Sequence, residues 1–67
     1  MSEGLHPLKL WLSREGRKVL WLAHELGVHP TLLPQWMAGL RPIPADQAQR
    51  IADLTHGAVP VDAWGSR

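Results

Sequence analysis

The N-terminal part of the chain has the hydrophobic spacing of two short helices. Pro7 suits the first position of a helix, and Gly16 suits a left-handed end. Between them, apolar residues recur at three- and four-residue spacing: Leu8, Trp11 and Leu12. A second apolar stripe precedes Gly27 and consists of Val19, Leu22, Ala23 and Leu26. We therefore expect helices over about 7–15 and 18–26.

The next stretch predicts a third, less regular helix, with Leu33 and Trp36 three residues apart on its inner side. Pro34 would clash with the carbonyl of Pro30 if the helix began there. A start capped by Thr31 places Pro34 in the first turn, where a missing N–H costs nothing. We expect this later start, or a distorted first turn.

A fourth helix is predicted from residue 45 to the glycine at position 57, with Asp46 in its first turn. Its inward face should carry Ala45, Ala48, Ile51 and Ala52. The remainder, about 58–67, contains Pro60 and is too short for another helix. It is expected to be an extended tail that packs back on the core through Val59, Val61 or Trp64.

No run alternates with period two, so no sheet is indicated and the predicted class is all-α, a compact bundle of four to five short helices. The turn from Gly27 to His29 is so short that the helices on either side must cross steeply. Ala23 leaves room for that crossing, and Gly27 can adopt the positive φ of the turn. Five apolar residues would lock the angle: Leu22, Leu26, Val28, Leu33 and Trp36. The prediction is a helix-turn-helix over about 18–39 within a single domain, 1–67.

Composition excludes several classes of protein. A chain of 67 residues without clustered titratable groups is not expected to be an enzyme. It has no Cys, and its four His residues lack ligand spacing, so neither a metal nor a cofactor is expected. Lys9 and Arg14 interrupt the first apolar run, so we expect no signal peptide, no membrane span and a cytoplasmic location. The net charge of +1 does not indicate any particular class of binding partner.

The sequence from Leu22 to Val59 resembles the lambda-repressor-like helix-turn-helix family, and more narrowly the small Cro-like and YdaS-like regulators of phages and prophages. The resemblance lies in LAHELGV, HPTLLPQWMAG, RPIPA and IADLTHGAV. It implies that the third helix enters the major groove of double-stranded DNA and that dimers bind half-sites about one helical turn apart. The implied function is a sequence-specific transcriptional regulator, a Cro-like repressor acting as a homodimer.

Carried over onto this chain, the resemblance puts Thr31 and Gln35 at positions that read base edges, and His29 at the start of the recognition helix. A glutamine amide can pair with adenine, and a threonine can offer its hydroxyl or its methyl group. His29 is expected to contact a phosphate when protonated, or else to be an ordinary turn histidine. Three cations are expected to contact the DNA backbone: Arg17, Lys18 and Arg41. Arg41 follows the third helix closely enough to reach a groove edge instead.

An alternative is a protein–protein interaction module on the same scaffold, for example one that binds a toxin or another regulator. It is favoured by the low net charge and by the apolar residues around the recognition helix, which are Pro30, Leu32, Pro34 and Leu40. Of the tryptophans, Trp11 and Trp36 are expected in the core, whereas Trp21 and Trp64 are expected to be partly exposed or part of an interface.

Overall fold

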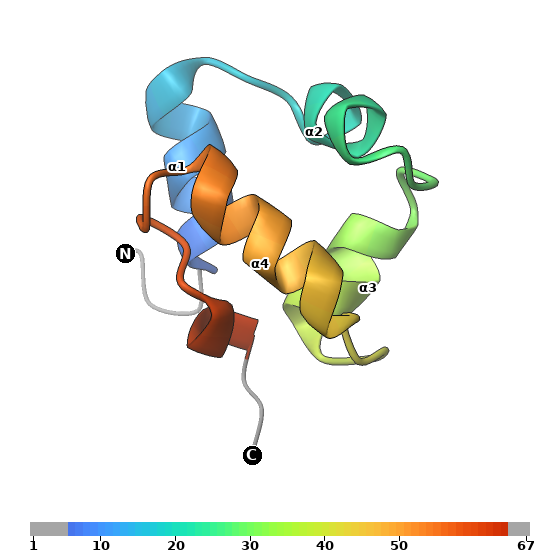
Figure 1. Ribbon diagram of the computed structural model, residues 1–67. Helices are drawn as coiled ribbons and strands as arrows, with labels where there is room; N and C mark the ends of the chain where they lie inside the picture. The colour runs from blue at the N-terminus through green and yellow to red at the C-terminus, as the bar shows by residue number, and fades with distance from the viewer. Residues whose placement is uncertain (1–5, 65–67) are drawn as a thin grey trace.

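The computed structural model describes residues 6–64, which form four α-helices, one short 3-10 helix and no strand (Figure 1). In chain order they are α1 (Pro7–Glu15), α2 (Val19–Leu26), α3 (Leu32–Ala38), α4 (Ala45–Leu54) and the 3-10 helix η1 (Val61–Trp64). In Figure 1, α4 crosses the middle of the molecule, with α1 on one side and α2 and α3 on the other. The predicted all-helical class is confirmed.

One hydrophobic core draws on every helical segment. Its fully buried large side chains are Leu8, Leu22, Leu33, Ile51 and Val59, and around them lie Leu12, Ala23, Leu26, Trp36, Ala48 and Trp64. The buried positions on α1, α2 and α3 follow the predicted apolar stripes. Val19 and Val28 are half-buried and pack against this core. Because each helix is short, this shared burial supplies most of the stability of the helices.

The connection between α2 and α3 begins as predicted. Gly27 is left-handed, with φ 71°. Its N–H donates to the carbonyl of His24, and the N–H of Val28 donates to that of Ala23. Two otherwise unpaired carbonyls at the helix end are thereby satisfied, and the chain turns sharply toward α3. Ala23 is 1 % exposed, so there is no space for a larger side chain at this bend.

The turn is longer than predicted, because α3 begins at Leu32 and five residues separate the two helices. Pro34 is the reason. It has no N–H with which to reach the carbonyl of Pro30, so that carbonyl accepts a shorter-range bond from Leu33 at 3.3 Å. The later start of α3 is thus confirmed. Thr31 holds the N-cap position as predicted, but it has helical backbone angles and its side chain makes no capping bond, so the predicted capping interaction is wrong.

The fourth helix buries Ala48 and Ile51 as predicted, but Ala45 is exposed. Periodicity identified the buried face of α4 but did not predict that its first residue is exposed. At the other end, the buried hydroxyl of Thr55 donates to the carbonyl of Ile51 at 2.8 Å and accepts from the N–H of Val59 at 3.1 Å. This side chain therefore fixes the reversal that follows α4.

The predicted extended tail is wrong for its described part, because residues 61–64 form η1. The N–H of Ala63 donates to the carbonyl of Pro60 at 2.9 Å, and η1 packs against α4. Val59 and Trp64 are buried as expected of residues that return to the core, whereas Val61 is exposed. Residues 65–67 of the predicted tail lie outside the described residues.

The tryptophans follow their predictions in part. Trp36 is buried as expected and Trp21 is half-buried, but Trp11 is half-buried instead of fully in the core. For Trp64 the sequence left open a return to the core or partial exposure, and the residue is buried, at 8 % exposed. Its ring lies 4.3 Å from that of His6, centroid to centroid. The contact joins the start of α1 to η1, two segments at opposite ends of the described chain.

His6 is also the cap of α1, since its Nδ1 accepts a hydrogen bond from the N–H of Leu8 at 3.1 Å. This role requires an unprotonated Nδ1. Burial lowers the pKa of His6 below its ordinary value of 6.5, while the backbone of Ala63 acts in the opposite direction. The geometry and the pKa therefore both favour the neutral ring. No role was predicted for His6 beyond the lack of metal-ligand spacing among the histidines, so this cap was missed.

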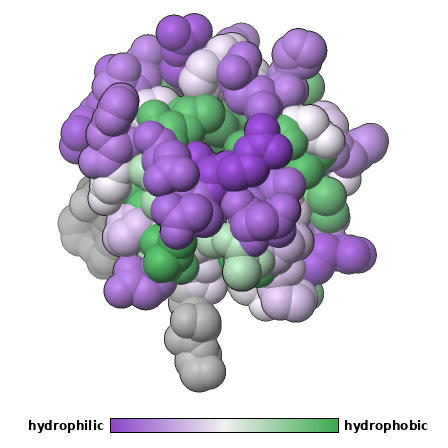
Figure 2. Space-filling view, viewed as in Figure 1, coloured by the Kyte–Doolittle hydropathy of each residue, from purple (hydrophilic) through white to green (hydrophobic). Residues whose placement is uncertain are grey.

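The outer face of α4 is polar (Figure 2). Gln49, Arg50 and Asp53 are exposed there, and the amide of Gln49 donates to the carboxylate of Asp53 at 3.0 Å. Apolar areas on this face are small and separated by polar side chains, as Figure 2 shows. This face of the described part of the molecule therefore shows scattered apolar side chains and no large continuous apolar patch.

Candidate nucleic-acid interface

Helix α3 has one buried and one accessible side. Leu33 and Trp36 are 0 % and 4 % exposed and hold the helix on the core. Thr31, Pro34 and Gln35 lie on the other side. Thr31 and Pro34 are exposed there, and Gln35 is half-buried. The predicted base-reading residues therefore lie on the accessible side of a helix whose opposite side anchors it.

Hydrogen bonds join four predicted site residues into one group, which we call the α3 polar cluster: His29, Thr31, Gln35 and Arg41. His29 Nδ1 lies 2.9 Å from the hydroxyl of Thr31 and accepts from the Thr31 N–H at 3.3 Å. The Gln35 amide nitrogen donates to the carbonyl of Thr31 at 3.0 Å. Arg41 Nε donates to the Gln35 amide oxygen at 3.2 Å. The cluster thus presents polar groups in a connected, oriented arrangement.

Arg41 reaches Gln35 because the chain folds back after α3. Gly39 is left-handed, with φ 77°, and the N–H of Leu40 donates to the Gln35 carbonyl at 3.0 Å. The residue after Leu40 consequently returns to the last turn of α3. Sequence reasoning placed Arg41 near the groove but missed its bond to Gln35. A glutamine four residues before a helix-ending glycine, with an arginine two residues after that glycine, is the signal that could have indicated it.

Apolar side chains flank the cluster. Leu40 is 80 % exposed, and Pro34 is also exposed. Leu32 and Pro30 are half-buried, so they contribute less accessible surface than predicted. The surface around the cluster is therefore mixed, with polar groups on α3 and an exposed leucine beside Arg41.

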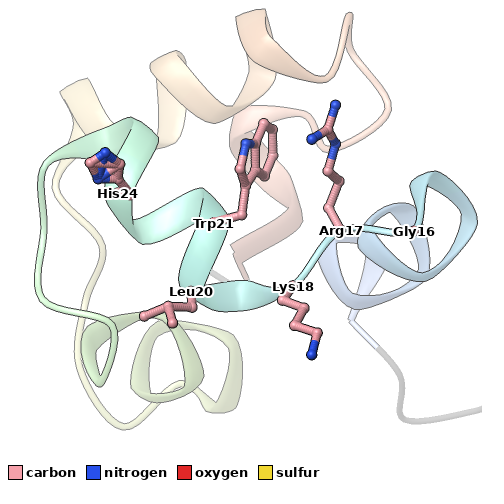
Figure 3. Close-up of a pocket in the computed structure, with 6 residues that line it drawn as sticks. All are labelled: Gly16, Arg17, Lys18, Leu20, Trp21 and His24. Carbon is pink, nitrogen blue, oxygen red and sulfur yellow. The ribbon is translucent and has the colours of Figure 1, made fainter.

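The two remaining predicted site residues, Arg17 and Lys18, lie in the connection between α1 and α2. They line a pocket of about 470 Å³, the α1–α2 pocket, together with Gly16, Leu20, Trp21 and His24 (Figure 3). The guanidinium carbon of Arg17 lies 4.5 Å from the centroid of the Trp21 ring, a cation–π contact. Trp21 in turn stacks on Trp11, with centroids 6.4 Å apart. This stack joins α1 to α2.

Lys18 points away from Arg17 on the other side of the chain, as Figure 3 shows. It is the cap residue of α2, and its side chain makes no capping bond, so the first N–H groups of the helix lack a side-chain partner there. Leu20, beside it, is 65 % exposed. The structure does not join Arg17 or Lys18 to the α3 polar cluster through any hydrogen bond found within residues 6–64.

Within residues 6–64, no group of three or more His, Cys, Asp or Glu side chains is placed to hold a metal ion. No helix in that range has the length and apolar character needed to cross a membrane. No protein-family model, curated protein or solved structure matches the chain. The side chains and their chemistry are therefore the basis for assigning a function.

Proposed function

We propose that the chain is a sequence-specific DNA-binding transcriptional regulator of the helix-turn-helix type, with α3 entering the major groove of double-stranded DNA. A repressor would act by occluding a promoter. The observation that carries the proposal is the α3 polar cluster, which groups hydrogen-bonding side chains on the accessible side of a core-anchored helix. An α-helix fits the major groove, where base edges offer a distinct pattern of donors and acceptors.

Cations outside α3 would hold the protein on the DNA backbone. Arg17 and Lys18 lie beside the first turn of α2, where the unpaired N–H groups add to their positive charge. Few such contacts are available per subunit, so a homodimer would double them and place two copies of α3 on one face of the duplex. A dimer of this kind would bind a two-fold symmetric operator.

Selection of bound sites from a random duplex pool tests this function directly. The expected result is a two-fold symmetric consensus whose binding weakens steeply as salt rises, because phosphate contacts release counterions. Sedimentation of the complex should give two chains per duplex. The proposal would be contradicted if no duplex were enriched from the pool at about 50 mM salt, or if the affinity for DNA did not depend on salt concentration.

A second candidate function is a protein–protein interaction module on the same scaffold. The exposed Leu40 beside the cluster and the exposed Leu20 in the α1–α2 pocket favour it, since both are large apolar side chains left in water. Leu20→Ser and Leu40→Ser test it without touching a predicted DNA contact. If the chain is an interaction module, one of these variants should lose self-association or partner binding. If it is a DNA-binding regulator whose dimer interface lies elsewhere, both variants should keep their affinity for the selected duplex.

A further inference from the structure

The α3 polar cluster also indicates which side chain reads a base, an inference that rests on the proposed function. We propose that Arg41 is a base reader that recognises guanine, and that Gln35 is a positioning residue that aims it. This differs from the sequence-based assignment, in which Gln35 read the base and Arg41 contacted the backbone or a groove edge. The observation behind it is the bond from Arg41 Nε to the Gln35 amide oxygen at 3.2 Å.

The atoms used in that bond matter. A guanidinium group has five N–H donors in a planar fork, of which one is on Nε and four are on the two terminal nitrogens. Gln35 holds the Nε donor. The terminal nitrogens form the edge of the fork that faces away from Nε, and they are the atoms that pair with O6 and N7 of guanine in the major groove. The Gln35 bond therefore orients the fork while leaving its guanine-binding edge for DNA.

Gln35 is itself held at both ends of its amide. The oxygen accepts from Arg41, and the nitrogen donates to the carbonyl of Thr31 at 3.0 Å. These bonds use one of the two amide hydrogens and one of the two oxygen lone pairs. The Thr31 carbonyl belongs to the backbone at the start of α3. The bond to it therefore fixes the Gln35 amide, and through it Arg41, relative to the helix that enters the groove. Pre-ordering of this kind reduces the entropy that Arg41 loses on binding.

Arg41 is well placed for this role. It is exposed, and it follows the left-handed Gly39, which returns the chain to the last turn of α3. An exposed arginine beside an accessible helix face can enter the groove with that helix, and bidentate recognition of guanine is the commonest specific contact an arginine makes there. Among the described residues, 6–64, Arg17 contacts the face of Trp21 and makes no hydrogen bond that would define the direction of its fork in this way.

Three variants measured against the selected consensus test the assignment: Arg41→Ala, Gln35→Ala and Gln35→Glu. Each is compared with the wild-type chain on duplexes carrying each base pair at every position. Arg41→Ala is expected to lose about 5- to 150-fold of preference at one G·C pair in each half-site and to keep the preferences elsewhere. Gln35→Ala is expected to lose preference at the same pair, by a smaller factor.

Gln35→Glu separates positioning from reading. A carboxylate still accepts from Arg41 Nε but has no N–H for adenine N7. Gln35→Glu loses the bond to the Thr31 carbonyl but keeps an acceptor for Arg41 Nε. The guanine preference is therefore expected to be retained better than in Gln35→Ala, while affinity for all duplexes falls because a negative charge is added near the phosphates. In the free protein, the Arg41 Nε–H resonance should be protected from exchange in the wild type and in Gln35→Glu, and should exchange fast in Gln35→Ala. Thermal unfolding of each variant is the control that checks whether the fold is retained.

The possible results distinguish the two proposals. Uniform weakening on all duplexes by Arg41→Ala would make Arg41 a backbone contact and overturn this inference alone. Loss of preference at an A·T pair in both Gln35 variants, with the G·C pair unchanged, would restore Gln35 as the base reader and also overturn it. No enrichment by the wild-type chain would overturn the proposed function, and this inference would fall with it.

Discussion

Two arginines on this small domain are held by different forces. Arg41 is fixed by a directional hydrogen bond to Gln35, and Gln35 is tied to the backbone of α3. Arg17 lies over the ring of Trp21 at 4.5 Å, and that ring stacks on Trp11. A cation–π contact depends weakly on how the guanidinium is turned in its plane, whereas the bond through Nε sets the direction of the fork.

The difference suggests that the two arginines have different roles in the proposed binding of DNA. A phosphate accepts a cation from many directions, so a residue that positions the protein needs its charge in the right place and little else. A base edge demands donors at defined positions, so a reading residue needs its orientation set beforehand. Under the proposed function, Arg17 would need to meet only the first requirement, and Arg41 would need to meet both. Several substitutions would break or sharpen this contrast.

The largest effect is expected from Trp36→Ala, which removes the support on the buried side of α3. Loss of a buried tryptophan costs about 3–5 kcal/mol of unfolding free energy, which is roughly all that a core of this size supplies. Both arginine regions would then be lost together because they share one core. Circular dichroism during urea unfolding measures the change. Leu40→Ala, at an 80 % exposed leucine, is the control and should stay within about 0.5 kcal/mol of the wild type.

Gly27→Ala should have the next largest effect, about 1–2 kcal/mol, because an alanine at φ 71° pays the cost of a left-handed backbone. An added Cβ would meet nothing within 4 Å, so no steric clash adds to that cost. Gly16→Ala is a matched control, with φ 69° and equally open surroundings. Equal losses of stability are expected, but only Gly27→Ala should change base preference, since it alone alters the bend before α3. Equal changes in base preference would contradict the contrast between the two regions.

Arg17→Ala should cost less in stability, about 0.5–1 kcal/mol, the value of an exposed cation–π contact. On DNA it should weaken all sequences alike and reduce the salt slope by about one, because one phosphate contact is lost. Arg17→Lys keeps the charge and should restore most of the salt slope. Titration of selected and scrambled duplexes at several salt concentrations gives both numbers. A loss confined to the selected duplex would show that Arg17 also reads sequence.

The smallest effect is expected from pH, and it should arise away from both arginines. The pKa of His6 is lowered in the folded protein, so the unfolded chain binds more protons between that pKa and 6.5. Stability should therefore fall as pH drops below 6.5 and level off below the folded pKa. Urea unfolding across this range measures the slope. His6→Asn keeps a capping side chain without titrating there and should remove this part of the slope; an unchanged slope would assign it to other groups.

Much of the fold was accessible from spacing alone. The positions of α1 and α2 with their glycine-marked ends, the start of α4 and most buried residues follow from local rules that link residues three and four apart. The end of α4 does not, because the helix stops at Leu54 with Thr55 as its cap and does not continue to Gly57. The errors arose where distant segments meet. Nothing in the local pattern shows that Trp64 returns to lie against His6, or that Thr55 closes the turn which brings it there. Ala45 has the right spacing for burial but is exposed at the first position of α4.

For the candidate site, the sequence by itself determined which residue types lie on α3 and beside it, and that Leu33 and Trp36 must turn the polar ones outward. It did so because helical geometry is local and repeats along the chain. Only the tertiary structure decided that Arg41 meets Gln35 and that Arg17 meets Trp21, with Trp11 behind it. Those contacts depend on how the chain reverses after α3 and how α1 packs on α2, which the shared core settles for all the helices at once.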